Sequence, residues 1–348
     1  MRQILVTPSN QMGIEMMKAA TYQKYGSADV VEIKEVARPT IKDNEVLVKV
    51  YATSVTTADW RLRASAFPIY AWLPGRIMFG LFAPKNKILG MDFSGRIVAK
   101  GNNVTQFKGG DEVFGFAGNG AHAEYLAISE DDAVVKKPVN LGYDEAAAVP
   151  FGALSALVFL RDFAKIKTGQ RVLINGASGG VGVFAVQLAK HFGADVTGVC
   201  GTANLNLVKS IGADHVIDYT AEDFANTAEP YDIILDTVGT TSFSRSKPAL
   251  TPSGVYVPLE FGLKEIFQSM LTSMIGTKKV VIGISGDSKD DLAFISDLLQ
   301  RGEIRPVIDA HYPLDRIADA HGRVESRHKT GSVVVSVEQS DTIRLAAA

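Results

Sequence analysis

Two kinds of hydrophobic pattern divide the sequence. Up to about Pro138, short segments alternate apolar and polar residues, as half-buried strands do, for example Val30–Val36 and Glu45–Ala52. From Arg171 onward, brief β-branched runs alternate with stretches whose apolar residues recur at helical spacing. The first pattern predicts a curled β-barrel, and the second predicts an α/β fold with a doubly wound parallel sheet.

The individual elements follow from these patterns. In the α/β part we expect strands at Arg171–Ile174, Asp195–Cys200, His215–Asp218, Tyr231–Val238, Gly254–Glu260 and Lys279–Ile284. Helical patterns cover Tyr143–Phe163, Val181–Phe192, Ala203–Ile211, Thr241–Leu250, Leu263–Ile275 and Asp290–Arg301. A closing strand, Thr330–Val337, is expected to rejoin the N-terminal barrel, so that the parallel sheet is inserted into the barrel domain. The expected domains are a discontinuous barrel (17–147 and 286–338), an α/β domain (148–285) and flexible tails (1–16 and 339–348).

A glycine-rich stretch, Asn175–Gly182, joins the first predicted parallel strand to a helix. Its four glycines permit a sharp turn and leave the helix N-terminus open to an anion such as pyrophosphate. The spacing G-x-x-G-G-x-G is one residue longer than the usual dinucleotide motif, so a plain tight connection between strand and helix stays an alternative. The candidate cofactor-binding residues here are Gly176, Ser178, Gly179, Gly180, Val181 and Gly182.

The end of the second parallel strand indicates which dinucleotide is bound. An Asp or Glu there would hold the ribose hydroxyls of NAD, but the region Val199–Asn204 contains no acid. We therefore expect NADP(H), with a 2′-phosphate pocket formed by Thr202, Asn204, Lys209 and Tyr219. Lys209 is equally well explained as an ordinary solvated helix lysine.

Composition excludes several classes of partner. The 36 Lys and Arg residues nearly balance the 38 Asp and Glu residues, so neither nucleic acid nor an anionic membrane is expected as the main partner. The single cysteine, Cys200, excludes an intrachain disulfide and a cysteine metal cluster. The apolar stretch Phe67–Phe82 is too short and too interrupted for a membrane span. With no signal peptide evident, a cytoplasmic location is expected.

The block Gly90–Gly115, GMDFSGRIVAKGNNVTQFKGGDEVFG, closely resembles the signature of the quinone oxidoreductase (zeta-crystallin-like) branch of the medium-chain dehydrogenase/reductase superfamily. Other blocks agree in order, at residues 123–125, 146–150, 175–182, 207–219, 236–239 and 302–306. The resemblance extends from about Met17 to Val337. It implies a GroES-like barrel with an inserted Rossmann domain, and a homodimer paired across the edge of the Rossmann sheet.

The resemblance also implies a reaction without a metal. Zinc-dependent members of the superfamily bind zinc through Cys and His, but their Gly-His-Glu motif is replaced here by Gly90-Met91-Asp92. The histidines are not paired at metal-ligand spacing, and His122 is interpreted as a packing or loop residue. Hydride transfer from NADPH to a small hydrophobic quinone or α,β-unsaturated carbonyl, with the proton supplied by solvent, fits such a cleft.

The loop Thr53–Trp60 resembles the family loop that lies beside the nicotinamide. Within it Thr56 is the candidate hydroxyl donor, Trp60 is a further catalytic candidate, and Asp59 is expected to brace the loop. Tyr51 is either a proton source or a packed strand tyrosine. The resemblance also implies that Asp236, Gly239, Val257 and Ile282 lie near the cofactor. Ser332 replaces a lysine that is common in relatives.

Two other functions stay open at this point. An enoyl-thioester reductase would need basic residues at the cleft mouth, for which Arg61, Arg63 and Arg76 are candidates. A non-catalytic NADPH-binding protein would use the aromatic segment 67–82 as a docking surface. In an enzyme, the same segment would form a pocket wall, a lid or a contact patch.

Overall fold

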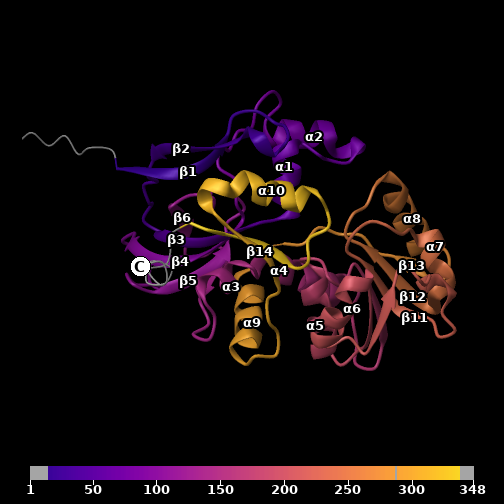
Figure 1. Cartoon of the computed structure of the whole chain (residues 1–348). Coiled ribbons are helices and arrows are strands. Elements are labelled where there is room, and N and C mark those ends of the chain that lie inside the picture. The colour runs from indigo at the N-terminus through magenta and orange to yellow at the C-terminus, as the bar shows by residue number, and fades with distance from the viewer. Residues whose placement is uncertain (1–14, 287, 338–348) are drawn as a thin grey trace, which may run out of the picture.

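The computed structural model describes residues 15–286 and 288–337 (Figure 1). The strands in this part form a two-stranded sheet, a six-stranded parallel sheet and a seven-stranded sheet. The two larger sheets lie side by side, with the β3–β5 region at the left of Figure 1 and β11–β13 at the right. Of the tails expected at 1–16 and 339–348, residues 1–14 and 339–348 lie outside the described residues, and Met16 begins a strand.

The seven-stranded sheet combines segments from both ends of the chain. Its strands are β3 (Glu45–Val55), β4 (Asp92–Lys100), β5 (Glu112–Phe116), β7 (Val134–Lys136), β14 (Ile308–Pro313) and β15 (Ser332–Ser336), with β6 (Tyr125–Ser129) paired to β3. β1 (Met16–Tyr22) and β2 (Val31–Ala37) form the small sheet. β15 pairs antiparallel with β3, with Val333 opposite Val55. This pairing confirms that the closing strand rejoins the N-terminal sheet, while the exact domain boundaries stay a prediction.

The parallel sheet has the strand order β10-β9-β8-β11-β12-β13. Its strands are β8 (Arg171–Asn175), β9 (Asp195–Cys200), β10 (His215–Asp218), β11 (Tyr231–Asp236), β12 (Leu250–Pro258) and β13 (Lys279–Val280). The order reverses between β8 and β11, which is the topological switch point of a Rossmann fold. The predicted doubly wound sheet is therefore confirmed, although β12 begins earlier and β13 is shorter than expected.

Helices cover the sheets and connect them. They are α1 (Thr57–Ala64), α2 (Ile69–Phe79), α3 (Tyr143–Ala147), α4 (Pro150–Val158), α5 (Gly182–His191), α6 (Leu205–Ser210), α7 (Phe243–Ser246), α8 (Leu263–Met274), α9 (Lys289–Gln300) and α10 (Ile317–Glu325). The helix expected at 143–163 is broken, because Pro150 starts a new helix and the last five residues form a π-helical turn. The helix expected at 241–250 is reduced to α7 and a short 3₁₀ turn. None of the described helices is long and apolar enough to cross a bilayer.

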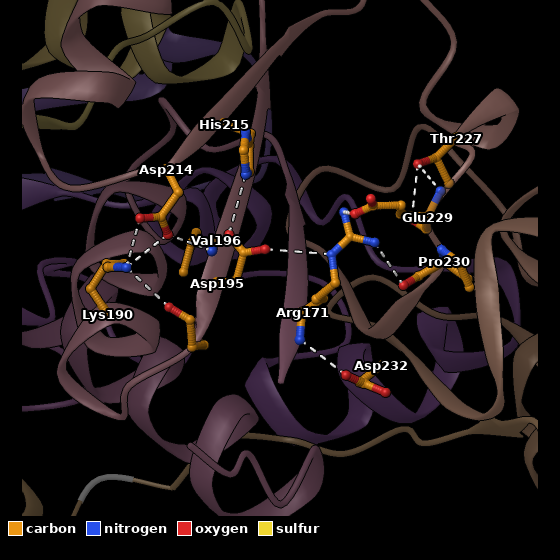
Figure 2. A network of polar contacts seen from close by, with 11 residues as sticks. Arg171, Lys190, Asp195, Val196, Asp214, His215, Thr227, Glu229, Pro230 and Asp232 are labelled. Atoms are coloured by element: carbon orange, nitrogen blue, oxygen red, sulfur yellow. Dashed lines mark hydrogen bonds and ion pairs between the residues drawn. The ribbon is translucent and has the colours of Figure 1, made fainter. Parts of the chain in front are cut away.

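A charged network lies at the amino ends of the parallel strands (Figure 2). Arg171, at the start of β8, contacts Asp195 of β9 at 3.4 Å and donates its backbone N–H to Asp232 at 3.0 Å. Lys190 pairs with Asp214 at 2.7 Å beside them. Ligands of open α/β sheets bind at the opposite, carboxyl ends of the strands, so this network connects strands and loops rather than forming the site.

Candidate active site

A cleft of about 610 Å³ lies between the parallel sheet and the seven-stranded sheet. One wall contains Thr56 and Trp60 from the start of α1. The other contains Gly179–Val181 of the glycine turn and Thr237–Gly239 after β11, and Lys329 also lines the space. The glycine turn and the 237–239 loop follow β8 and β11, so the cleft lies at the switch point of the parallel sheet.

The glycines of the turn have two different functions. Gly176 has a φ of +81°, and a Cβ there would come within 2.5 Å of Val238 Cγ1. A Cβ on Gly182 would be 2.0 Å from the carbonyl oxygen of Gly176. These two glycines allow the turn to close on itself and lie outside the cleft lining, unlike Gly179, Gly180 and Val181. Gly176 and Gly182 therefore have a conformational role in the turn, and their expected contact with a cofactor stays a prediction.

The turn is joined directly to the start of β15. The Gly331 N–H donates to the Ser178 carbonyl at 2.8 Å, and Gly179 pairs with Gly331 in a parallel bridge. Asn204 donates its amide N–H to Ser178 Oγ at 3.3 Å and accepts from Thr330 Oγ1 at 3.3 Å. The polar side chains of Ser178 and Asn204, both predicted cofactor residues, therefore hold the turn against the C-terminal segment.

Lys329 is a cleft residue that sequence reasoning missed. Its ammonium donates to the Gly331 carbonyl, and a Cβ on Gly180 would lie 2.6 Å from Nζ. Burial lowers the pKa of Lys329 to about 8, while the carboxylates of Asp309 and Asp92 favour the charged form. A cation therefore lies against the turn even though Ser332 replaces the lysine common in relatives. The available signal was a lysine two positions before Gly331.

Thr56 and Asp59 form a reciprocal cap at the start of α1. Thr56 Oγ1 donates to Asp59 Oδ2 at 2.6 Å and accepts from the Asp59 N–H at 3.1 Å. Asp59 is fully buried and also accepts from the Gly90 N–H at 2.9 Å. The bracing role expected for Asp59 agrees with these bonds. In this structure the hydroxyl proton of Thr56 is used within the cap, while its donation to a ligand stays a prediction.

Asp92 is a buried carboxyl group in the wall of the cleft. It accepts from Ser54 Oγ at 2.8 Å and from the Phe151 N–H at 2.9 Å. Burial raises the pKa of Asp92 well above its usual range, although both hydrogen bonds oppose the shift. In the sequence, Asp92 stands out only as part of a changed zinc motif, because its place in the cleft depends on how β4 pairs with β3.

Several predicted residues lie elsewhere. Tyr51 stacks on Tyr143 with ring centroids 4.5 Å apart and is not among the cleft residues, so the packed-tyrosine alternative holds. Val257 is fully buried in the core of the parallel sheet. Ile282 packs against a second core cluster, next to Gly283, which does line the cleft. The contacts with cofactor or substrate expected for Tyr51, Val257 and Ile282 stay predictions.

Asp236 organises the loop after β11 instead of facing a ligand. Its fully buried carboxylate accepts from Asn175 Nδ2 at 2.9 Å, the Gly239 N–H at 3.0 Å and the Tyr256 hydroxyl at 3.1 Å. Gly239 has a φ of +67° and does line the cleft. Asp236 therefore positions the Gly239 backbone, and its expected contact with a cofactor stays a prediction.

The predicted 2′-phosphate pocket contains an acid that was not foreseen. Thr202 donates its hydroxyl to Asp218, at the carboxyl end of β10, and this bond holds the pKa of Asp218 below its usual range. Tyr219 follows, with 64% of its surface exposed. Lys209 is exposed in the last turn of α6. The parallel pairing of Asp218 with Cys200 brings this acid to the end of β9.

The described residues contain no group of three or more His, Cys, Asp or Glu side chains that could hold a metal ion. His122 is fully buried and donates from Nε2 to the Ser54 carbonyl at 3.1 Å, in agreement with the packing role. Cys200 is buried in β9, and burial raises its pKa to about 11.

Comparisons with known proteins agree with this architecture. Residues 42–139 match the alcohol dehydrogenase GroES-like domain family, and residues 211–335 match the zinc-binding dehydrogenase family. The chloroplast envelope quinone oxidoreductase homolog of Arabidopsis thaliana is 33% identical over 338 residues, covering 93% of this chain and 99% of that protein. The chain belongs to the quinone oxidoreductase-like family of the medium-chain dehydrogenase/reductase superfamily.

Two further comparisons agree with this family. The NADPH-dependent alkenal/one oxidoreductase of Arabidopsis thaliana is 31% identical, covering 92% of this chain and 79% of that protein. The solved structure of the quinone oxidoreductase from Coxiella burnetii aligns with a TM-score of 0.82 at 27% identity, covering 93% of this chain and 100% of that one. The Rossmann and GroES-like parts predicted from the sequence are thus shown for the whole aligned region.

Proposed function

We propose that this chain is a metal-free reductase that transfers hydride from NADPH to quinones or α,β-unsaturated carbonyl compounds. The observation that carries the proposal is the cleft, whose lining combines the glycine turn and the Lys329 ammonium with Thr56 and Asp92. Two relatives, named a quinone oxidoreductase homolog and an NADPH-dependent alkenal/one oxidoreductase, support the same chemistry.

The residues on the sheet side fit a dinucleotide. Gly179 and Gly180 leave the backbone bare before α5, and a Cβ on Gly180 would fill the space beside Lys329. Backbone N–H groups at a helix N-terminus and an ammonium group complement a pyrophosphate. β9 ends without an acid of its own, which supports NADPH over NADH. When bound, the nicotinamide supplies the hydride.

The other wall of the cleft contains Thr56 and Asp92, which we propose act at the reacting end of the cofactor and substrate. Thr56 Oγ1 donates its proton to Asp59 and accepts from the Asp59 N–H, which leaves its second lone pair to accept a hydrogen bond from an amide N–H of a ligand. Burial raises the pKa of Asp92, which favours the protonated form of this carboxyl beside the cleft. A conjugated acceptor gains negative charge on oxygen as hydride arrives, and a nearby proton or ammonium stabilises that charge.

The donor set of the cleft does not fit a catalytic zinc. The cleft lining among the described residues contains no Cys or His, and Met91 stands where zinc-dependent relatives have the motif histidine. Catalytic zinc sites use three protein ligands, mostly His, Cys or carboxylates. We therefore propose no zinc-dependent reaction, although residues 211–335 match the zinc-binding dehydrogenase family.

The arginines considered for a thioester substrate are already occupied. Arg61 pairs with Glu260 at 2.6 Å. Arg63 is fully buried and pairs with Glu325 at 2.6 Å. Arg76 donates to the Leu81 carbonyl. These contacts favour a small conjugated carbonyl over a phosphopantetheine thioester.

A turnover assay tests the proposal. Purified protein, dialysed against EDTA, is mixed with NADPH and either benzoquinone, a short enone or crotonyl-CoA, and NADPH oxidation is followed optically. We expect oxidation with the first two acceptors and the same rate without the EDTA treatment. NADPH binding without oxidation by any acceptor would support the non-catalytic alternative. Activity that disappears with EDTA and returns with zinc would exclude the metal-free reaction.

We further propose a homodimer formed through the β13 edge of the parallel sheet, and a cytoplasmic location. β13 is an edge strand, and α8 beside it exposes apolar residues such as Phe267 and Met274. Pairing of two such edges would cover both features.

A further inference from the structure

The segment between Asp59 and Asp92 carries an apolar surface that the cleft does not use. Its exposed large apolar side chains belong to α2 and the loop after it, and we call them the α2 surface. They are Ile69, Trp72, Leu73, Ile77, Met78, Phe79, Leu81 and Phe82. Ile69 is 93% exposed and Phe82 is 88% exposed. None of the eight lines the cleft, to which α2 and its flanks contribute Pro68 and Tyr70.

The charge of this segment is strongly one-sided. Residues 60–91 contain five Arg or Lys residues and no Asp or Glu, although the whole chain has a net charge of −2. Arg61 and Arg63 are paired with distant glutamates, as described above. Within the described part of the chain, no carboxylate forms an ion pair with the other three, Arg76, Lys85 and Lys87. The balanced overall composition concealed this local excess.

We propose that the α2 surface docks on an anionic phospholipid bilayer. An apolar helix with an interfacial tryptophan and flanking cations inserts its side chains at the boundary of headgroups and acyl chains, while the cations attract acidic headgroups. A second copy of this chain is a poorer occupant. A two-fold interface would place Arg76, Lys85 and Lys87 against the same residues of the other copy, without an acid from this segment to compensate.

Docking would also define where the substrate comes from, a consequence that rests on the proposed function. The Tyr70 hydroxyl donates to the Phe261 carbonyl at 2.9 Å, and both residues line the cleft. The α2 surface is therefore continuous with one wall of the cleft, on the side where α2 and α8 approach each other in Figure 1. Conjugated carbonyls and quinones with long apolar tails, which partition into bilayers, are the substrate class that this arrangement favours.

Vesicle sedimentation with the full chain tests the docking. Vesicles contain phosphatidylcholine alone or phosphatidylcholine with phosphatidylserine. We expect the protein to sediment with the anionic vesicles, less so at high salt, and about tenfold more weakly for the double variant Ile69→Asp, Phe82→Asp. Lys87→Gln should weaken binding to a smaller degree. The matched control is Val139→Asp, at a residue 87% exposed in a different loop, which should bind like the wild type.

Turnover of a water-soluble quinone is measured on every variant. It should be unchanged, which shows that the variants fold and separates this inference from the proposed function. The docking would be overturned if the wild type did not sediment with anionic vesicles. It would also be overturned if Val139→Asp lost as much vesicle binding as the double variant. A change of the double variant from dimer to monomer with vesicle binding intact would overturn it as well, since the α2 surface would then bind a second copy.

Discussion

Among single residues, Lys329 is the one whose charge we expect to control cofactor binding. Its ammonium lies against Gly180, where a pyrophosphate would be held. Replacing Lys329 by Met should weaken NADPH binding about tenfold or more, because a charge-assisted hydrogen bond typically contributes about 1.5–3 kcal/mol. Binding is measured by calorimetry, and the rate at saturating NADPH should change less than the dissociation constant.

The lowered pKa of Lys329 predicts a pH dependence with a definite sign. Below about pH 8 the free protein carries the ammonium, and above it the amine becomes neutral. NADPH affinity should therefore fall as the pH rises through 8. The variant Lys329→Arg stays charged and should show a flatter profile over the same range. A wild-type affinity that is constant from pH 7 to roughly 9 would contradict this role of Lys329.

Asp218 should limit the preference for the phosphorylated cofactor. Thr202 brings this carboxylate to the position where a 2′-phosphate would lie, and two negative charges repel. Asp218→Asn should raise the preference for NADPH over NADH roughly fivefold, a value in the range of exposed charge interactions. The ratio of kcat/KM for the two cofactors is the measurement. Glu222→Gln makes the same charge change without touching Thr202 and should leave the ratio nearly unchanged.

At the scale of elements, the cap of α1 links stability to the site. Thr56 forms both hydrogen bonds of the capping box and also lines the cleft. Thr56→Val should lower the free energy of unfolding by about 1 kcal/mol, and Thr56→Ser should restore most of it. Denaturant unfolding of the three proteins provides the comparison. Equal unfolding midpoints would show that Asp59 holds the loop without Thr56.

The order of strands and helices in the Rossmann part could be predicted, because each element has a local signature. The hydrophobic period and the glycine turn fixed β8 and α5 to within a residue. α2 was not predicted as a helix, since Pro74 and Gly75 interrupt its pattern, yet the structure continues the helix through both. Gly75 is needed there, because a Cβ would lie 2.9 Å from the Phe67 ring. Such tertiary contacts have no signature in the local sequence.

At the scale of the whole molecule, the cleft is made by long-range pairing. Lys329 reaches the glycine turn only because β15 returns to β3 and Gly331, just before β15, pairs with Gly179. Asp218 reaches Thr202 only through the β9–β10 pairing. Sequence motifs therefore located the turn and the Thr56 loop, but not the charges that the fold adds to them. Those charges are the ones our cofactor predictions depend on.

The proposed dimer can be tested without disturbing the cleft. On the exposed face of α8, Met270 and Met274 stand beside the β13 edge, and Met274 is 78% exposed. We expect sedimentation equilibrium to show a dimer for the wild type and a monomer for Met270→Glu, Met274→Glu, because a buried charge without a partner destabilises an interface. The α2 variant Ile69→Asp should stay dimeric. Neither Met270 nor Met274 lines the cleft, so the monomeric variant should still reduce benzoquinone; loss of turnover on dissociation would mean that the partner subunit completes the site.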